Sequence, residues 1–194
     1  FKIPIFIYRL PNIFGKWSKP NYNSVVATFC HNIIRNIPIN IHDPLSKIKL
    51  VYIDDLIKNF ILLLDNANKE LIPDIYFRSV KPEYEITVGN LAKQIIMFKE
   101  MRSTHILERV GSGFKRALYS TYVSFLPKDK FSYPVVAHKD NRGSFVEMLK
   151  TPDCGQFSVF TVSPNMTRGE HYHNTKTEKF LVIKGNASFN FFNL

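Results

Sequence analysis

The residue pattern of this chain changes near residue 130, and the change limits the folds open to it. Before this point, short apolar runs rich in β-branched and aromatic residues alternate with segments whose apolar residues recur at helical spacing. Such alternation is typical of an α/β layer with parallel strands. After it, short aromatic and β-branched runs are separated only by turns, which indicates an all-β unit. We therefore expect two domains, residues 1–128 and 129–194.

The same patterns predict individual elements. In the first domain we expect a buried parallel strand over 2–9, a loop over 10–17, strands over 48–53 and 75–80, and helices that begin near 25, 56, 88 and 114. Ser24 and Thr87 are the expected caps of the first and third helices. In the second domain we expect strands over 135–136, 144–149, 156–162, 180–183 and 187–192.

Composition narrows the class of protein. The chain has 194 residues, of which 45% are apolar and 22% charged, as in ordinary globular proteins. Its net charge of +10 would favour binding to nucleic acid, but no basic run exceeds two residues. An anionic substrate would be attracted to such a surface equally well. We therefore expect no nucleic-acid partner. No apolar stretch is long enough to cross a membrane, and Cys30 and Cys154 show no pairing pattern. These features predict a cytoplasmic protein with free thiols and no membrane contact.

Two histidines near the end of the chain predict a metal site. His171 and His173 are two residues apart, so in a strand both imidazoles lie on one face. Glu178 follows a polar turn, at the start of what looks like the returning strand of a hairpin. Two nitrogens and one carboxylate oxygen suit a divalent first-row metal, for which we expect zinc. The alternative is two surface histidines beside a glutamate on an ordinary hairpin.

The spacing of His171, His173, Glu178 and Gly185 resembles the first metal motif of the cupin family. One departure is Asn165, which stands where the family has a glycine and affects a turn rather than a ligand. The resemblance implies that residues 129–194 are the first part of a cupin, a double-stranded β-helix. It also implies a fourth ligand, a histidine, from a second motif beyond the end of this chain.

The first domain resembles the distal half of extended short-chain dehydrogenase/reductases, which are Rossmann-type enzymes that act on nucleotide sugars. Matching residues are Arg9, Asn12 and Gly15 in an R-x-x-N-x-x-G loop, followed later by Asp54 in a strand-to-helix turn. The resemblance implies that Arg9 and Asn12 contact the substrate and that Asn12 also contacts the cofactor. Simpler roles remain open: Arg9 as a solvated strand end, Asn12 as a turn residue that bonds its own backbone, and Asp54 as a helix cap.

Two motifs that these reductases need are absent from the chain. It has no glycine-rich G-x-x-G-x-x-G loop for the pyrophosphate and no Tyr-x-x-x-Lys pair for proton transfer. We therefore expect both, and with them the main NADPH site, to lie upstream of Phe1. The chain is accordingly expected to be a fragment, and inactive as a reductase by itself.

Both halves together resemble the CapF-type bifunctional enzymes of capsular polysaccharide biosynthesis. The resemblance runs through RLPNIFGKW, PNYNSVVATFCHNI, LVYIDDL, LYSTYVSFLP, DNRGSFVEMLKT, GQFSV and RGEHYHNTKTEKFLVIKG. It implies a UDP-linked 2-acetamido-4-keto-6-deoxyhexose as substrate. The cupin domain would epimerise C3 and the reductase domain would reduce the C4 ketone with NADPH, on the route to UDP-N-acetyl-L-fucosamine for capsule or surface polysaccharide.

The same resemblance assigns roles to residues of the second domain. His171 and His173 would act through the bound metal, and Arg168 would pair with the diphosphate or orient a carboxylate. A solvent-facing strand residue is the simpler interpretation of Arg168. The complete protein is expected to be a homodimer. The competing function is a non-catalytic cupin module for sugar binding or sensing, with a remnant α/β domain.

Overall fold

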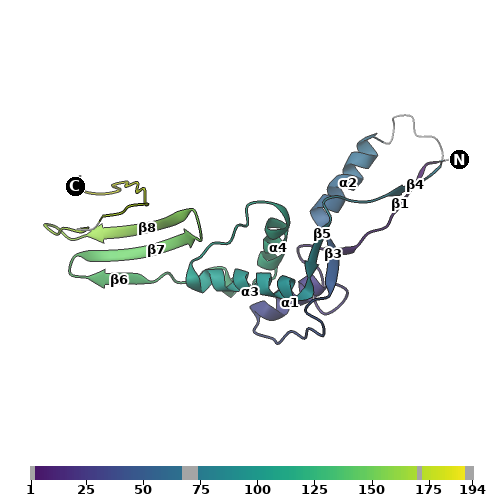
Figure 1. Ribbon diagram of the computed structural model, residues 1–194, viewed down its shortest axis with the longest axis horizontal. Coiled ribbons are helices and arrows are strands. Elements are labelled where there is room, and N and C mark those ends of the chain that lie inside the picture. The colour runs from purple at the N-terminus through teal and green to yellow at the C-terminus, as the bar shows by residue number, and fades with distance from the viewer. Residues whose placement is uncertain (1–2, 67–73, 170–171, 191–194) are drawn as a thin grey trace.

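The computed structural model describes residues 3–66, 74–169 and 172–190. Figure 1 shows an elongated molecule with an α/β part at one end and a small antiparallel sheet at the other. The elements up to residue 126 mix helices and strands, and those from 137 to 162 are strands alone, as the sequence pattern predicts. The chain is therefore α/β followed by all-β.

A two-stranded parallel sheet forms one end of the α/β part. Strand β1 (Ile5–Tyr8) pairs in parallel with β4 (Ile75–Arg78). Helix α2 (Ile53–Asn66) runs beside this pair, and its Phe60 ring meets the Tyr8 ring edge-on at 4.9 Å between centroids. The expected parallel direction of β1 is confirmed, but its expected burial is wrong: Ile5, Ile7, Ile75 and Phe77 are exposed. The reason is that no described element covers that face of the pair.

A second, three-stranded sheet lies next to the first, in the order β2 (Asn12–Phe14), β3 (Lys47–Tyr52) and β5 (Tyr84–Thr87). The expected loop over 10–17 is wrong at 12–14, where the chain pairs in parallel with β3 from Asn12↔Leu50 to Phe14↔Tyr52. This pairing is long-range, and three residues are too few to show a strand pattern. Strand β5 pairs antiparallel with β3.

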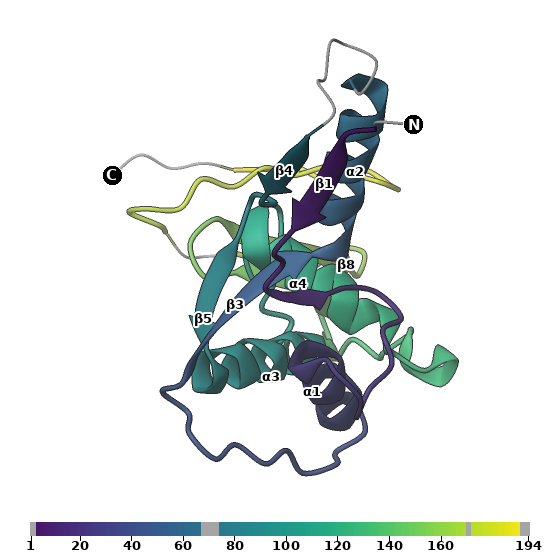
Figure 2. The same ribbon diagram turned by 90° about the vertical axis from the view of Figure 1, so that its right-hand side faces the viewer.

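Three helices pack beneath this sheet, as Figure 2 shows for two of them. They are α1 (Val25–Ile34), α3 (Val88–Thr104) and α4 (Gly113–Ser124). The Ser24 and Thr87 side chains accept hydrogen bonds from the first turns of α1 and α3, so both predicted caps are confirmed. The main core lies among these helices and the sheet; its most buried side chains include Phe14, Val26, Cys30, Leu50, Leu91, Ile95, Phe98, Leu118 and Tyr122.

The second part is an antiparallel sheet of β6 (Ala137–Asp140), β7 (Gly143–Thr151) and β8 (Gly155–Val162). Gly143, at the β6–β7 turn, has φ +136°, and a Cβ there would lie 2.1 Å from the Thr161 carbonyl oxygen. The predicted strand over 180–183 and the hairpin around it are wrong in the described range 172–190, which pairs with no strand. Instead Phe180 packs between Phe160 and Phe189, with ring centroids 6.4 and 5.0 Å apart.

The two parts are joined by more than the linker. Ile106, just after α3, forms a parallel bridge with Lys150 of β7. The Leu107 amide donates to the Lys150 carbonyl at 2.7 Å, and the Lys150 amide donates to the His105 carbonyl at 2.8 Å. Strand β6 pairs only with the first part of β7, so the segment from His105 to Leu107 occupies the edge that β6 leaves open.

Candidate functional site

Asn12 opens β2 and reaches across to the neighbouring strand. Its Nδ2 donates to the carbonyl oxygen of Lys49 at 3.3 Å. The bond to its own backbone that the simpler interpretation required is therefore not the one observed. Because the amide nitrogen is engaged, the amide oxygen remains to accept a hydrogen bond from a ligand.

A charged cluster lies just past the end of β2. The Lys16 Nζ donates to Asp54 Oδ2 at 3.0 Å and lies 6.0 Å from the centroid of the Tyr52 ring. This hydrogen bond raises the pKa of Lys16, while burial and then the neighbouring Asp54 raise the pKa of Tyr52. At neutral pH the lysine is charged and the phenol is neutral. Asp54 also lies in the first turn of α2, where the unpaired amide groups of the helix favour a carboxylate. It therefore stabilises both the start of the helix and the Lys16 ammonium.

Sequence reasoning missed Lys16 and Tyr52. The signal for Lys16 was its position directly after Gly15, at the end of the R-x-x-N-x-x-G motif. Tyr52 precedes the predicted Asp54 by two residues, but its burial against β2 depends on the β2–β3 pairing. The cluster has a charged amine beside a neutral phenol, and the lysine is held in place by a carboxylate.

Arg9 follows β1 and is exposed, with its guanidinium carbon 5.6 Å from the centroid of the Phe77 ring. It borders an open cavity of about 460 Å³ that Phe77, Arg78 and Ser79 also line. The Arg78 guanidinium instead lies over the rings of Phe6 and Tyr76, which face away from Phe77 because strand side chains alternate. The two arginines therefore do not converge. Arg9 follows a strand of the two-stranded sheet, whereas Asn12 opens a strand of the three-stranded sheet.

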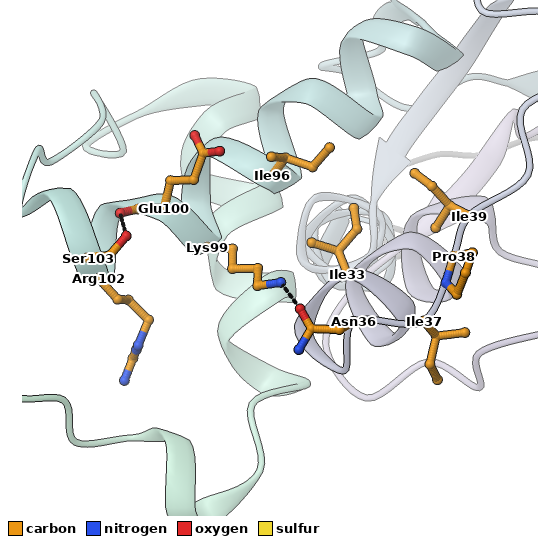
Figure 3. Close-up of a pocket in the computed structure, with 10 residues that line it drawn as sticks. All are labelled: Ile33, Asn36, Ile37, Pro38, Ile39, Ile96, Lys99, Glu100, Arg102 and Ser103. Atoms are coloured by element: carbon orange, nitrogen blue, oxygen red, sulfur yellow. Dashed lines mark hydrogen bonds between the residues drawn. The ribbon is translucent and has the colours of Figure 1, made fainter.

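A larger cavity of about 620 Å³ lies between the end of α1 and α3 (Figure 3). Half of its lining residues are isoleucine or proline, and Lys99 Nζ donates to Asn36 Oδ1 at 2.5 Å across it. Its lining residues are Ile33, Asn36, Ile37, Pro38, Ile39, Ile96, Lys99, Glu100, Arg102 and Ser103. None of the site residues expected from the sequence lies there.

In the β part the structure brings together two of the three expected metal ligands. His173 Nε2 and Glu178 Oε1 are 3.5 Å apart, although the chain between them is not a hairpin. Two ligands about 2.1 Å from one metal with tetrahedral geometry lie about 3.4 Å apart, so this pair fits a shared zinc ion. The third, His171, lies outside the described residues. Within the described ranges no three His, Cys, Asp or Glu side chains form a cluster.

The Arg168 side chain is half-buried and hydrogen-bonds to two strands of the antiparallel sheet. Its Nη1 donates to the carbonyl oxygens of Ser144 at 3.3 Å and Thr161 at 3.1 Å, and so links β7 with β8. The simpler expectation of a solvent-facing strand residue does not describe this side chain. Arg168 also adds to the positive potential at Asp140, whose pKa is lowered first by its hydrogen bonds with Arg142.

Among the described residues, no helix combines the length and the apolar character that a bilayer crossing requires.

Comparisons with known proteins indicate the family to which this chain is related. Residues 138–194 match the family model of the polysaccharide biosynthesis C-terminal domain. The chain is 58% identical over 191 residues to a UDP-2-acetamido-2,6-beta-L-arabino-hexul-4-ose reductase of Pseudomonas aeruginosa. That alignment covers 98% of this chain and 50% of the relative. The chain thus spans about half the length of the curated relative that it matches.

Solved structures agree with this relation. A structure of CapF with the inhibitor 3-isopropenyl-tropolone has a TM-score of 0.79 and 40% identity, and covers 88% of this chain and 48% of that chain. The capsular polysaccharide assembling protein CapF from Staphylococcus aureus has a TM-score of 0.78 at 40% identity, with coverage of 88% of this chain and 45% of that chain. The chain belongs to the CapF-type family and corresponds to about half the length of its members.

Proposed function

We propose that the complete protein is a bifunctional nucleotide-sugar epimerase and reductase with a UDP-linked 2-acetamido-4-keto-6-deoxyhexose as substrate. The observation that carries the proposal is the 58% identity to a UDP-sugar reductase, which extends through both parts of the chain. In this proposal residues 1–128 are the distal part of a Rossmann-type reductase domain and residues 129–194 the first part of a cupin domain. The product serves the route to UDP-N-acetyl-L-fucosamine, and the enzyme acts in the cytoplasm as a homodimer.

The α/β part positions the substrate for reduction at C4. Asn12 is held by the Lys49 carbonyl and offers its amide oxygen to a hydroxyl of the substrate or of NADPH. Lys16 stays charged beside Asp54 and favours the anionic diphosphate nearby. Arg9 is exposed beside the cavity at the end of β1, where it is available for a further anionic contact. NADPH supplies the hydride when bound, and its main site lies in the half of the relatives' length that this chain does not span.

The β part performs the epimerisation at C3, which removes a proton next to the C4 ketone and returns it on the opposite face. His171, His173 and Glu178 are the residues that would hold a divalent metal, with zinc as the expected ion. A metal there supplies Lewis-acid stabilisation of the negative charge that develops on the ketone oxygen. Arg168, three residues before His171, links β7 to β8 through its bonds to two strand carbonyls.

The test uses the complete protein and separates the two reactions. Epimerisation is followed as exchange of the C3 proton with solvent deuterium, and reduction as the loss of NADPH absorbance. His173→Ala should lower deuterium exchange at least about 100-fold, because the metal that would stabilise the developing charge loses a ligand, and should leave NADPH binding intact. Asn12→Ala should slow NADPH oxidation and leave deuterium exchange in place.

His138→Ala is the matched control, because His138 is an exposed histidine of β6 outside the site. It should change neither reaction. Wild-type protein that binds the UDP-sugar but shows neither exchange nor NADPH oxidation would contradict the proposal and favour the non-catalytic sugar-binding module. Loss of NADPH binding together with exchange in His173→Ala, with the fold intact, would contradict the division between the two parts.

A further inference from the structure

The segment that carries His173 and Glu178 contacts one residue of β8 from both of its ends. The guanidinium carbon of Arg168, which precedes His173, lies 6.0 Å from the centroid of the Phe160 ring. The ring of Phe180, which follows Glu178, meets the same Phe160 ring edge-on, with the centroids 6.4 Å apart and the planes at 86°. Both arrangements are ones in which a cation or a second ring attracts an aromatic ring. The two ends of the segment therefore meet at Phe160.

Hydrogen bonds also fix the Arg168 end of the segment. Arg168 Nη1 donates to the carbonyl oxygens of Ser144 at 3.3 Å and Thr161 at 3.1 Å, one on β7 and one on β8. A turn that contains Asn165, with φ 61°, lies between β8 and Arg168. The chain therefore leaves β8, turns and is held back against the strand that it has just left.

Aromatic packing fixes the Phe180 end of the segment. The Phe180 ring packs between Phe160 and Phe189, whose ring centroid is 5.0 Å away. The three rings are 41, 44 and 45% exposed, so they form a small surface cluster rather than a core. Because such rings bury less apolar area than those of the α/β part, their contribution to stability alone is a weak reason for the arrangement.

The two expected metal ligands lack the support of a sheet. Within the described range 172–190 the chain pairs with no strand, yet His173 Nε2 and Glu178 Oε1 lie 3.5 Å apart. Without strand pairing, metal binding would have to order the whole segment, and ordering each residue lowers its conformational entropy. When both ends are already held together, the loop is closed before the metal binds, and less entropy is lost at that step.

We infer that Phe160 is a positioning residue for the metal site, which acts through its contacts with Arg168 and Phe180. It keeps the two ends of the segment together, so that His173 and Glu178 face one ion. The inference rests on the proposed function, because it takes these two side chains as metal ligands. The competing explanation is a surface cluster that stabilises the sheet and has no effect on the metal.

The zinc affinity of the complete protein tests the inference without any substrate, by competition with a chromophoric chelator. Phe160→Leu keeps an apolar side chain and removes the ring, so zinc should bind about tenfold more weakly, as is typical when a residue that orients metal ligands is lost. Phe160→Tyr keeps the ring and should restore wild-type affinity. Phe157→Leu is the matched control, because Phe157 is an exposed ring of the same strand but lies on its opposite face. It should leave zinc affinity unchanged.

A spectroscopic measurement separates positioning from stability. Visible absorption bands of Co²⁺ bound in place of zinc depend on coordination geometry. At saturating Co²⁺ we expect Phe160→Leu to change these bands and Phe157→Leu to give the wild-type spectrum. Phe180→Leu changes the other side of the same contact from outside the strands, so it tests the inference even where Phe160→Leu does not fold. It should also weaken zinc binding, and the double variant should lose less affinity than the two single losses combined, because the two rings share one contact.

Two results would overturn the inference. One is wild-type zinc affinity in both Phe160→Leu and Phe180→Leu; if His173→Ala still abolishes exchange of the C3 proton, the proposed function then stands. The other is an equal loss of zinc affinity in Phe157→Leu, since a general effect on the sheet would then account for both. Weaker zinc binding in Phe160→Leu but not in Phe157→Leu, with no C3 exchange in the wild type, would support the positioning role and contradict the proposed function alone.

Discussion

At the scale of single residues, burial of Tyr122 ties the fold to pH. The side chain is 2% exposed among α1, α3 and α4, and burial raises its pKa to about 12. Since the unfolded phenol titrates near pH 10, the folded state gains its full advantage below pH 10 and loses it as the pH rises towards 12. The direction follows from the neutral phenol being the form that the core accepts.

We therefore expect the free energy of unfolding to fall on the order of 2 kcal/mol between pH 10 and 12 through this residue. Denaturant unfolding across that range should show a smaller fall in Tyr122→Phe than in the wild type. Tyr22→Phe removes an exposed phenol and is the control, whose pH dependence should match the wild type. An unchanged pH dependence in Tyr122→Phe would mean that the alkaline loss arises elsewhere.

The proposed metal site is also tested with single residues. The 3.5 Å separation of His173 Nε2 and Glu178 Oε1 fits two ligands of one ion, and His171 is expected to be the third. We expect His171→Ala, His173→Ala and Glu178→Ala each to lower the zinc content of the complete protein, measured by elemental analysis after removal of free metal. His138→Ala should retain wild-type content. Full zinc occupancy in all three ligand variants would exclude these residues as the site.

At the scale of elements, two helix starts with the same residue differ in their hydrogen bonds. Ser24 Oγ accepts from the Ala27 amide at 3.3 Å at the start of α1, whereas Ser112, at the start of α4, makes no side-chain capping bond. Only the first serine satisfies an amide that the helix leaves unpaired. The two positions therefore form a natural matched pair.

Ser24→Ala should lower the free energy of unfolding by about 1 kcal/mol, and Ser112→Ala by distinctly less. Thermal or denaturant unfolding of the two variants under the same conditions measures the difference. Equal losses of stability in the two variants would show that the Ser24 capping bond makes no measurable contribution of its own.

At the scale of the whole molecule, contacts along the linker hold the two parts together. Arg102 of α3 donates from Nη2 to the carbonyl oxygens of Lys130 and Phe131, and its guanidinium carbon lies 4.5 Å from the Tyr133 ring centroid. Arg109 forms an ion pair with Asp153 at the β7–β8 turn, which adds a contact beyond the Ile106 bridge. Arg102 of α3, together with Ile106 and Arg109 in the segment after it, therefore makes contacts with the linker and the antiparallel sheet.

Arg102→Ala should loosen the linker over residues 127–133, because two carbonyls lose their donor and a ring loses its cation. The expected result is faster amide hydrogen exchange and faster proteolysis in this segment. Lys99→Ala, one turn earlier on α3, removes a cation that bonds Asn36 instead and should leave the linker rates unchanged. Equal rates in both variants and the wild type would locate the junction's stability in the Ile106–Lys150 bridge and the Arg109–Asp153 ion pair.

Sequence patterns determined the local features of this protein. The caps at Ser24 and Thr87, the strands over 144–149 and 156–162, and the change from α/β to all-β near residue 130 all depend on residues a few positions apart. His173 and Glu178 do lie 3.5 Å apart, but the hairpin from which their proximity was predicted is absent from the described segment. Interactions over four or five residues need no distant partner, so they can be predicted without the fold.

Tertiary structure alone decided the features that join distant segments. Strand β2 exists because it pairs with β3, and this pairing creates the Lys16, Tyr52 and Asp54 cluster. Arg168 reaches carbonyls 24 and 7 residues away. The exposure of β1 likewise depends on what covers its sheet rather than on its own apolar sequence. Backbone groups form hydrogen bonds, and apolar faces are buried, against segments that can lie far away in the sequence. The local residue pattern does not predict which segment that is.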